Sequence, residues 1–257
     1  MLLLLVLTLV LNISLGQVNI PLKEVFKSLT GEAASKDTWE YIIVNFRLPK
    51  AITAVLVGIG LSISGLLMQT LFRNPLAGPY VLGLSSGSSL GVALVILGAT
   101  FMPHLVSEML LSNYGIIVAS CLGSFLVLLL ILLVSSSLRD TATLLIIGLM
   151  FSSFTSAIVS VLTYFSSAEQ LQKFTFWSMG NLGNLSWQNI LILGVTVTVG
   201  LLLSLISIKS LDALLLGENY AKSMGLNIKK SRYIIIIATS LLAGSITAFA
   251  GPIAFIG

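Results

Sequence analysis

The stretch AITAVLVGIGLSISGLLMQTLF (Ala51–Phe72) contains no acidic or basic side chain, and RNPLAGPYVLGLSSG (Arg73–Gly87) follows it directly. A helix crosses the hydrocarbon of a bilayer in about 20 residues, so the first stretch is long enough for one span. Prolines and glycines interrupt the second, and irregular backbone at membrane depth is tolerated only where protein buries it or where it lines a water-filled cavity. The pattern predicts a loop that dips into a pore, with Asn74 and Leu76 at its tip. A tight turn explains Asn-Pro equally well.

The rest of the chain repeats this distribution of charge. Hydrophobic residues make up 56% of the 257 residues and charged residues only 9%, against about 25% in ordinary soluble domains. All 13 basic and 9 acidic residues lie between long charge-free stretches. We therefore predict an all-α polytopic membrane protein in which residues 1–257 form a single transmembrane domain. The seven predicted spans are Leu2–Leu15, Ala51–Leu71, Val81–Phe101, Ile116–Val134, Thr143–Phe165, Ile190–Ile208 and Tyr233–Phe249.

The placement of the charges also bears on the source of energy. Ion-coupled transporters usually keep ionisable groups inside their spans, whereas here the charges avoid them and His104 lies near a span end. The energy for transport must then come from another protein, unless the chain is an uncoupled channel or a scaffold. The lone Cys121 lies in an apolar run and is expected to be a packing residue. We expect no catalytic residue, cofactor or metal site.

Lys and Arg indicate how the chain is oriented. With the N-terminus inside, the inner loops hold seven of these residues and the outer loops one, once the long first loop (Gly16–Lys50) is left out. The positive-inside rule therefore favours an inner N-terminus.

The segment LDALLLGENYAKSMGLNIKKSR (Leu211–Arg232) is the longest polar stretch of the second half. Its pattern predicts one amphipathic helix over Ala213–Met224, with an i,i+4 pair of Glu218 and Lys222 and a cap at Gly225. Such a helix either lies on lipid or docks into the groove of a partner. A basic cluster after it would anchor the last span on the inner side, namely Lys229, Lys230 and Arg232.

The segment RLPK (Arg47–Lys50) places two cations at the start of the second span, on the predicted outer side. They could pair with carboxylates of an external partner. Ordinary snorkelling at a helix start explains the same residues.

These segments resemble a known family. RLPK, VGIGLSISGLLMQTLFRNPLAGPYVLGLSSG and LLLGENYAKSMGL occur in the same order as in the FecCD family, the permease subunits of ABC importers for iron–siderophores, haem and vitamin B12. The resemblance runs from about Arg47 to Gly257, and Gln69–Gly87 and Gly217–Gly225 are its most specific blocks. It implies a type II importer bundle of about ten spans. Because this chain ends at GPIAFIG, we expect the last three spans of the family to be missing.

The resemblance also implies roles for individual residues. Lys50 stands where the family usually has Arg, and Ala142 where it usually has a hydroxyl residue. The implied roles are docking of a binding protein by Arg47 and Lys50, a cytoplasmic gate of Asn74, Leu76, Thr141 and Ala142, and an ATPase coupling helix with Gly217, Glu218, Ala221 and Gly225.

The resemblance further implies the partners. They are two ATP-binding cassette ATPase subunits, an extracytoplasmic substrate-binding protein and a second permease copy or a paralogue, with no nucleic acid. The expected function is import of an iron–siderophore-type chelate across a bacterial or archaeal cytoplasmic membrane, with ATP hydrolysis by the partner rather than by this chain. Haem and vitamin B12 are alternative substrates, and a secondary transporter or channel is the alternative from another class.

Overall fold

The computed structural model describes residues 2–30, 32, 35–137 and 141–253, and every regular element among them is helical. A π-helical turn at Ile43–Arg47 and 3-10 turns at Pro79–Leu82 and Gly98–Phe101 join some of the α-helices. The α-helices are α1 (Leu2–Ser14), α2 (Leu22–Thr30), α3 (Asp37–Ile42), α4 (Leu48–Phe72), α5 (Leu84–Ile96), α6 (His104–Leu110), α7 (Asn113–Ser137), α8 (Thr141–Phe165), α9 (Ala168–Ser178), α10 (Trp187–Ile206), α11 (Ile208–Leu215), α12 (Glu218–Ser223) and α13 (Ile228–Ala250).

Five helical stretches within the described residues are long and apolar enough to cross a membrane, which confirms five of the seven predicted spans. They are Asp37–Phe72, Asn113–Val134, Thr143–Phe165, Trp187–Ile206 and Ile228–Ala250.

The two other predicted spans are shorter helices. α1 and α5 have 13 residues each, or about 20 Å at 1.5 Å per residue, against about 30 Å of hydrocarbon. The prediction of one continuous span over Val81–Phe101 is wrong. Its helix begins only after Gly83, whose φ of 72° is left-handed, and ends before the 3-10 turn at Gly98–Phe101.

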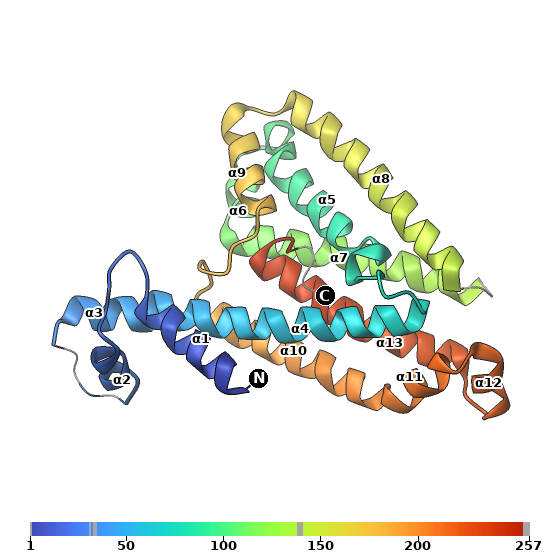
Figure 1. Ribbon diagram of the computed structural model, residues 1–257. Helices are drawn as coiled ribbons and strands as arrows, with labels where there is room; N and C mark the ends of the chain where they lie inside the picture. Colours follow the sequence, from blue (N-terminus) through green and yellow to red (C-terminus); the bar gives the residue numbers. More distant parts are fainter. Residues whose placement is uncertain (1, 31, 33–34, 138–140, 254–257) are drawn as a thin grey trace.

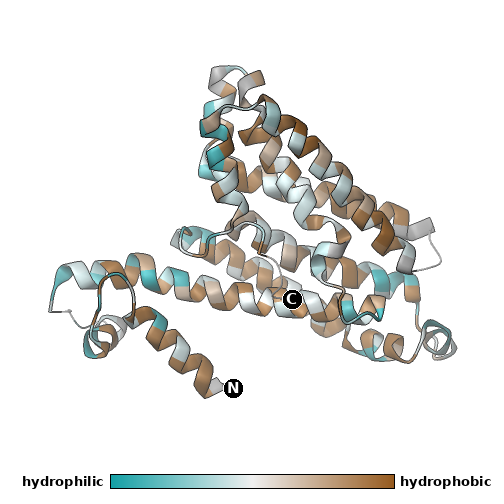
Figure 2. Ribbon diagram, turned by 45° about the horizontal axis from the view of Figure 1, so that its top comes forward, coloured by the Kyte–Doolittle hydropathy of each residue, from teal (hydrophilic) through white to brown (hydrophobic). Residues whose placement is uncertain are grey.

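The long helices form two layers (Figure 1). α4, α10 and α13 run side by side, and α5, α7 and α8 lie above them, with α13 packed against α4, α10 and α7. Hydrophobic residues run along the long helices, and hydrophilic residues gather toward helix ends and connections (Figure 2). Among the five long stretches α13 is the most buried and α8 the least. The core is therefore centred on α13, and α8 leaves most of its apolar surface uncovered.

The two ends of the bundle carry different segments. The end of α4, the start of α8, and α11 and α12 lie at the right-hand end in Figure 1. α2, α3 and the start of α4 lie at the left-hand end. We call these the α12 end and the α3 end.

The backbones of α5 and α7 touch where glycines face each other. A Cβ on Gly87 would lie 2.6 Å from the Gly123 carbonyl oxygen, and a Cβ on Gly123 would fall onto the Gly87 carbonyl oxygen. A Cβ on Gly91 would meet the Ala119 carbonyl oxygen in the same way. Small residues allow membrane helices this close approach, so these glycines set the distance between α5 and α7.

Arg47 holds α1 against the start of α4. Its Nη1 donates to the carbonyl oxygens of Ile13 at 2.6 Å and Ser14 at 2.7 Å, and its Nη2 donates to that of Val18. The last carbonyls of a helix have no partner within the helix, and the negative end of the helix dipole attracts a cation there. We call this arrangement the Arg47 clasp.

Two hydrogen bonds between Glu24 and Ser35 order the first loop. The Glu24 carboxylate accepts hydrogen bonds from the Ser35 backbone N–H and hydroxyl, both at 2.8 Å. These bonds, the backbone one first, lower the pKa of Glu24 below its usual value. The stabilisation that these two hydrogen bonds give to the folded protein is therefore present above the ordinary Glu pKa. It is lost as pH falls through the depressed pKa.

Gly123→Ala should destabilise the protein by about 1–3 kcal/mol, because the new methyl meets backbone that cannot rotate away. The measurement is thermal unfolding in detergent, followed by size-exclusion chromatography. Gly58→Ala is the matched control, because a Cβ at Gly58 has nothing within 4 Å. Equal melting temperatures for the two variants would contradict the close α5–α7 contact.

Arg47→Gln should open the end of α1, because hydrogen bonds to a charged group contribute about 1.5–3 kcal/mol. Hydrogen exchange of a peptide spanning residues 10–20 is expected to accelerate about tenfold or more. Lys50→Gln, which changes an exposed cation one turn away, should leave this peptide unaffected. Unchanged exchange in Arg47→Gln would mean that the clasp does not hold α1.

Candidate functional site

The predicted pore loop is a sharp turn at the α12 end. α4 stops at Arg73, whose φ of 49° is left-handed, and the Asn74 backbone N–H returns to the Gln69 carbonyl at 3.1 Å. The Asn74 side-chain oxygen then accepts the Leu76 N–H at 2.9 Å, and the Leu76 side chain is 89% exposed. Asn74 and Leu76 thus lie at the tip of this turn, as predicted. Their role in gating stays a prediction.

The other predicted gate residues lie at the start of α8. Thr141 is the first residue of α8 and Ala142 the second, while their side chains lie outside the described part of the structure. The start of α8 lies at the same end of the bundle as the Asn74–Leu76 turn (Figure 1). The structure therefore brings the two predicted gate segments to one end, by their backbones.

The prediction of one helix over Ala213–Met224 is wrong. α11 ends at Leu215 and α12 begins at Glu218, with Gly217 between them at φ 122° and ψ 145°. Side chains other than glycine rarely adopt that conformation, so Gly217 turns the chain where the apolar pattern alone continues.

The cap at Gly225 is confirmed. Its φ is 82°, its N–H bonds to the Lys222 carbonyl at 2.9 Å, and the Leu226 N–H bonds to the Ala221 carbonyl at 3.0 Å. These two hydrogen bonds close α12 in the manner of a Schellman motif.

An ion pair and a buried side chain hold α12 against the bundle. Glu218 was predicted to pair with Lys222, and the structure places its Oε1 3.3 Å from Nη2 of Arg232 in α13. The Arg232 side chain is 5% exposed and is turned into the bundle, while anchoring of the last span on the inner side by its basic cluster stays a prediction. Ala221 is fully buried and faces the core.

The outer side of this segment carries large exposed apolar side chains among exposed polar ones. We call four of the apolar side chains, from α11, the turn and α12, the coupling patch: Leu215, Leu216, Tyr220 and Met224. Exposed apolar side chains at the end of a membrane bundle are typical of a surface that lies on lipid or docks into the groove of a partner protein.

The two residues predicted to dock a binding protein lie in different surroundings. Arg47 is turned toward α1 by its clasp, while Lys50 is exposed and lies alongside Gly183 in the connection from α9 to α10. Lys50 is exposed to an acidic partner, and Arg47 would have to leave three carbonyls to reach one. The docking role of both residues stays a prediction.

A groove of about 330 Å³ lies between α5 and α8. Six hydroxyl side chains and one valine line it: Ser85, Ser86, Ser89, Thr155, Ser156, Ser160 and Val159. On each helix the hydroxyls recur at positions i, i+1 and i+4 or i+5, which is one helical face. That shared spacing is the signal that could have found α8 as the second wall.

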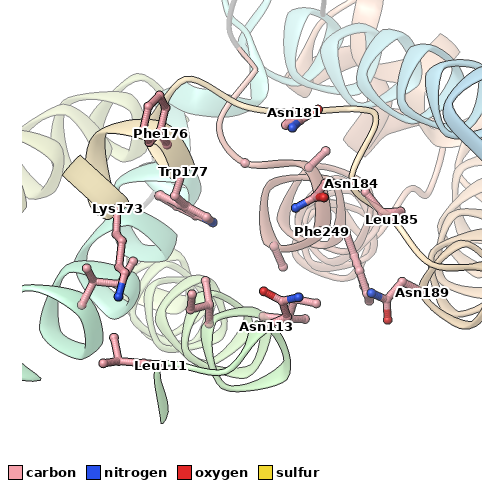
Figure 3. A pocket seen from close by; sticks show the side chains of 16 residues that line it. Leu111, Asn113, Lys173, Phe176, Trp177, Asn181, Asn184, Leu185, Asn189 and Phe249 are labelled. Carbon is pink, nitrogen blue, oxygen red and sulfur yellow. The ribbon is translucent and has the colours of Figure 1, made fainter. Parts of the chain in front are cut away.

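A second cavity of about 410 Å³ lies at the opposite end, among α7, α9, α10 and α13. Figure 3 shows side chains from these helices around it. Its polar lining consists of Lys173 and four amides, namely Asn113, Asn181, Asn184 and Asn189. In neither cavity, nor elsewhere in the described residues, do three His, Cys, Asp or Glu side chains gather to hold a metal ion.

Comparison with known proteins agrees with this architecture. The model of the FecCD transport family matches residues 4–257. A hemin transport system permease protein of Yersinia pestis is 35% identical over 98% of this chain and 74% of its own length. A vitamin B12 import system permease protein of Vibrio parahaemolyticus is 34% identical over 84% of this chain and 63% of its own. A molybdate import system permease protein of Haemophilus influenzae is 31% identical over 99% of this chain and 74% of its own length.

A solved structure supports the same relation at the level of the fold. It is described as a metal-chelate-type ABC transporter in an inward-facing conformation. It superposes with a TM-score of 0.82 at 31% identity, covering 98% of this chain and 75% of that one. The helices, their order and the family match agree along nearly the whole chain. The chain belongs to the FecCD transport family and is a multi-pass membrane permease of the ABC importer class.

Proposed function

We propose that this permease imports an iron–siderophore-type chelate across the cytoplasmic membrane, driven by a separate ATPase that docks on the coupling patch. The observation that carries the proposal is the position of this patch. It lies at the same end of the bundle as the Asn74–Leu76 turn, on a segment that Glu218 joins to α13. Force applied to α12 therefore has a direct route to the helices around the path.

The substrate is proposed from the groove between α5 and α8. Its wall is neutral and rich in hydroxyls, which can exchange hydrogen bonds with many polar ligands and bind none of them tightly. A wall of this type suits a large chelate that passes through intact. Haem is the second candidate, favoured by the hemin permease that is 35% identical over 98% of the chain.

A second permease copy is proposed to pack against α8. This helix is the least buried of the long ones and exposes Leu149, Met150 and Phe154 along one side. A partner there would also close the hydroxyl-lined groove, because α8 forms one of its walls. The path would then run between two copies.

The orientation follows from the coupling patch. If the ATPase binds at the α12 end, that end faces the cytoplasm, and α1, which begins midway along the bundle and runs toward the α3 end (Figure 1), has its N-terminus directed to the cytoplasmic side. The binding protein would approach the α3 end, where Lys50 is exposed.

Gly225→Val should weaken binding of the ATPase about tenfold or more. A β-branched residue at φ 82° strains the turn by at least the roughly 1–2 kcal/mol of a left-handed conformation, and this turn closes α12. The measurement is co-purification of the ATPase with the permease in detergent.

Gly225→Asn is the matched control, because Asn tolerates the left-handed region and a side chain there meets nothing within 4 Å. It should keep the complex. An intact complex with Gly225→Val, in a protein whose gel-filtration profile is unchanged, would remove α12 from the ATPase contact.

Cells that lack their own chelate permease and carry this importer with its ATPase and binding protein should take up a labelled ferric siderophore. Uptake should stop when the ATPase carries a substitution that blocks ATP hydrolysis. Parallel assays with haem, cobalamin and molybdate separate the substrates. Uptake of haem alone would favour the second candidate, and uptake that persists without ATP hydrolysis would indicate a secondary transporter or channel.

A further inference from the structure

One side chain connects the loop after α4 to the segment that carries the coupling patch. The guanidinium of Arg73 donates from Nε at 2.9 Å and from Nη2 at 2.6 Å to the carbonyl oxygen of Leu214 in α11. These residues are 141 positions apart in the chain. Two N–H groups on one acceptor hold the guanidinium in a fixed direction, so the contact transmits displacement as well as attraction.

The acceptor lies at a helix end. The Leu214 carbonyl is in the last turn of α11, where carbonyls lack partners within the helix and the dipole is negative. It also receives the Gly217 N–H at 3.1 Å, so both of its lone pairs have donors. The bond from Arg73 thus completes the end of α11 immediately before the chain turns into α12.

Gly217 makes room for this bond. A Cβ at Gly217 would lie 3.2 Å from the Nη2 atom of Arg73. The glycine that separates α11 from α12 therefore also admits the guanidinium beside the turn. A side chain at this position would press on Arg73 as well as strain the backbone.

Arg73 itself is held in an unusual backbone conformation. Within the described part of the chain it is the one residue other than glycine with a positive φ, at 49°. It ends α4 and directly precedes Asn74, whose side chain shapes the exposed turn at Leu76. A shift of the Leu214 carbonyl that moves the guanidinium acts on the residue from which this turn starts.

We propose that Arg73 is a positioning residue that transmits movement of α11 and α12 to the Asn74–Leu76 turn. This inference rests on the proposed function, since it assigns the route by which an ATPase bound at the coupling patch reaches the gate. The ion pair of Glu218 and Arg232 joins the same segment to α13. The segment that carries the coupling patch is therefore joined to α13 by this ion pair and to the end of α4 by Arg73.

The test uses the complete importer, with ATPase and binding protein, in proteoliposomes. Arg73→Asn removes the reach of the side chain and keeps a residue that tolerates the left-handed backbone. Arg73→Met keeps the length of the side chain and removes its donors. Both variants should keep the ATPase bound and hydrolyse ATP within about twofold of wild type, while substrate transported per ATP falls about tenfold or more, as expected for loss of bonds to a charged group.

Two further variants sharpen the result. Arg73→Lys keeps the charge and a donor, so it should recover part of the lost transport per ATP. Lys209→Asn removes an exposed cation from α11 at the same end and should leave the ratio unchanged. A role in folding alone would change yield and melting temperature and would leave the ratio intact.

The outcomes separate the proposals. Wild-type transport per ATP in either Arg73→Asn or Arg73→Met overturns the inference. So does loss of the ATPase from a variant that elutes and melts as wild type, because Arg73 would then serve the contact with the ATPase. Failure of the wild-type complex to transport with ATP would count against the proposed function instead.

Discussion

Carbonyl oxygens left over at helix ends are the constraint on which this structure depends. In a membrane protein, water is not at hand to satisfy every such group, so the protein itself must do so. Arg47 serves the end of α1 and Arg73 the end of α11. At the end of α13 the Asn181 backbone N–H donates to the Ala250 carbonyl at 2.7 Å. In each case the donor comes from a distant part of the chain, so satisfying the helix end also joins two elements. The hydrogen bonds that satisfy these helix ends therefore also connect the elements at both ends of the bundle.

Much of the fold follows from the spacing of charges in the sequence, because a charge in hydrocarbon is costly wherever it lies. That rule predicted the long helices and says nothing of where a helix breaks inside an apolar run. α5 is short because Gly83 turns the chain before it and a 3-10 turn follows it. Likewise α11 and α12 are separate because of Gly217, where hydrophobic periodicity alone favours one helix. The rules for i,i+4 pairs favour Lys222 for Glu218, whereas the fold places Arg232 of α13 within reach.

The candidate functional residues also divide into those that a local sequence pattern predicts and those that depend on the fold. The tip at Asn74 and Leu76 was predictable, because Asn-Pro and the surrounding glycines determine a local turn. The Arg47 clasp was not, because its acceptors are backbone carbonyls, which every residue carries and no sequence pattern marks. The hydroxyl-lined groove lies between these cases. Each of its two faces is visible as a spacing of Ser and Thr, and only the packing of α5 beside α8 makes them one surface.

The contact between α5 and α7 restricts how the groove can change width. Sliding of one helix past another normally depends on side chains that adjust between them. Where Gly87 and Gly123 place backbone directly on backbone, with the Val127 side chain packed against Gly87, no long side chain separates the two helices. The two helices must then travel as a single rigid unit, carrying Ser85, Ser86 and Ser89 with them. Widening or narrowing of the groove then comes from movement of α8 relative to this unit, so the packing favours a rocking motion of one wall against the other.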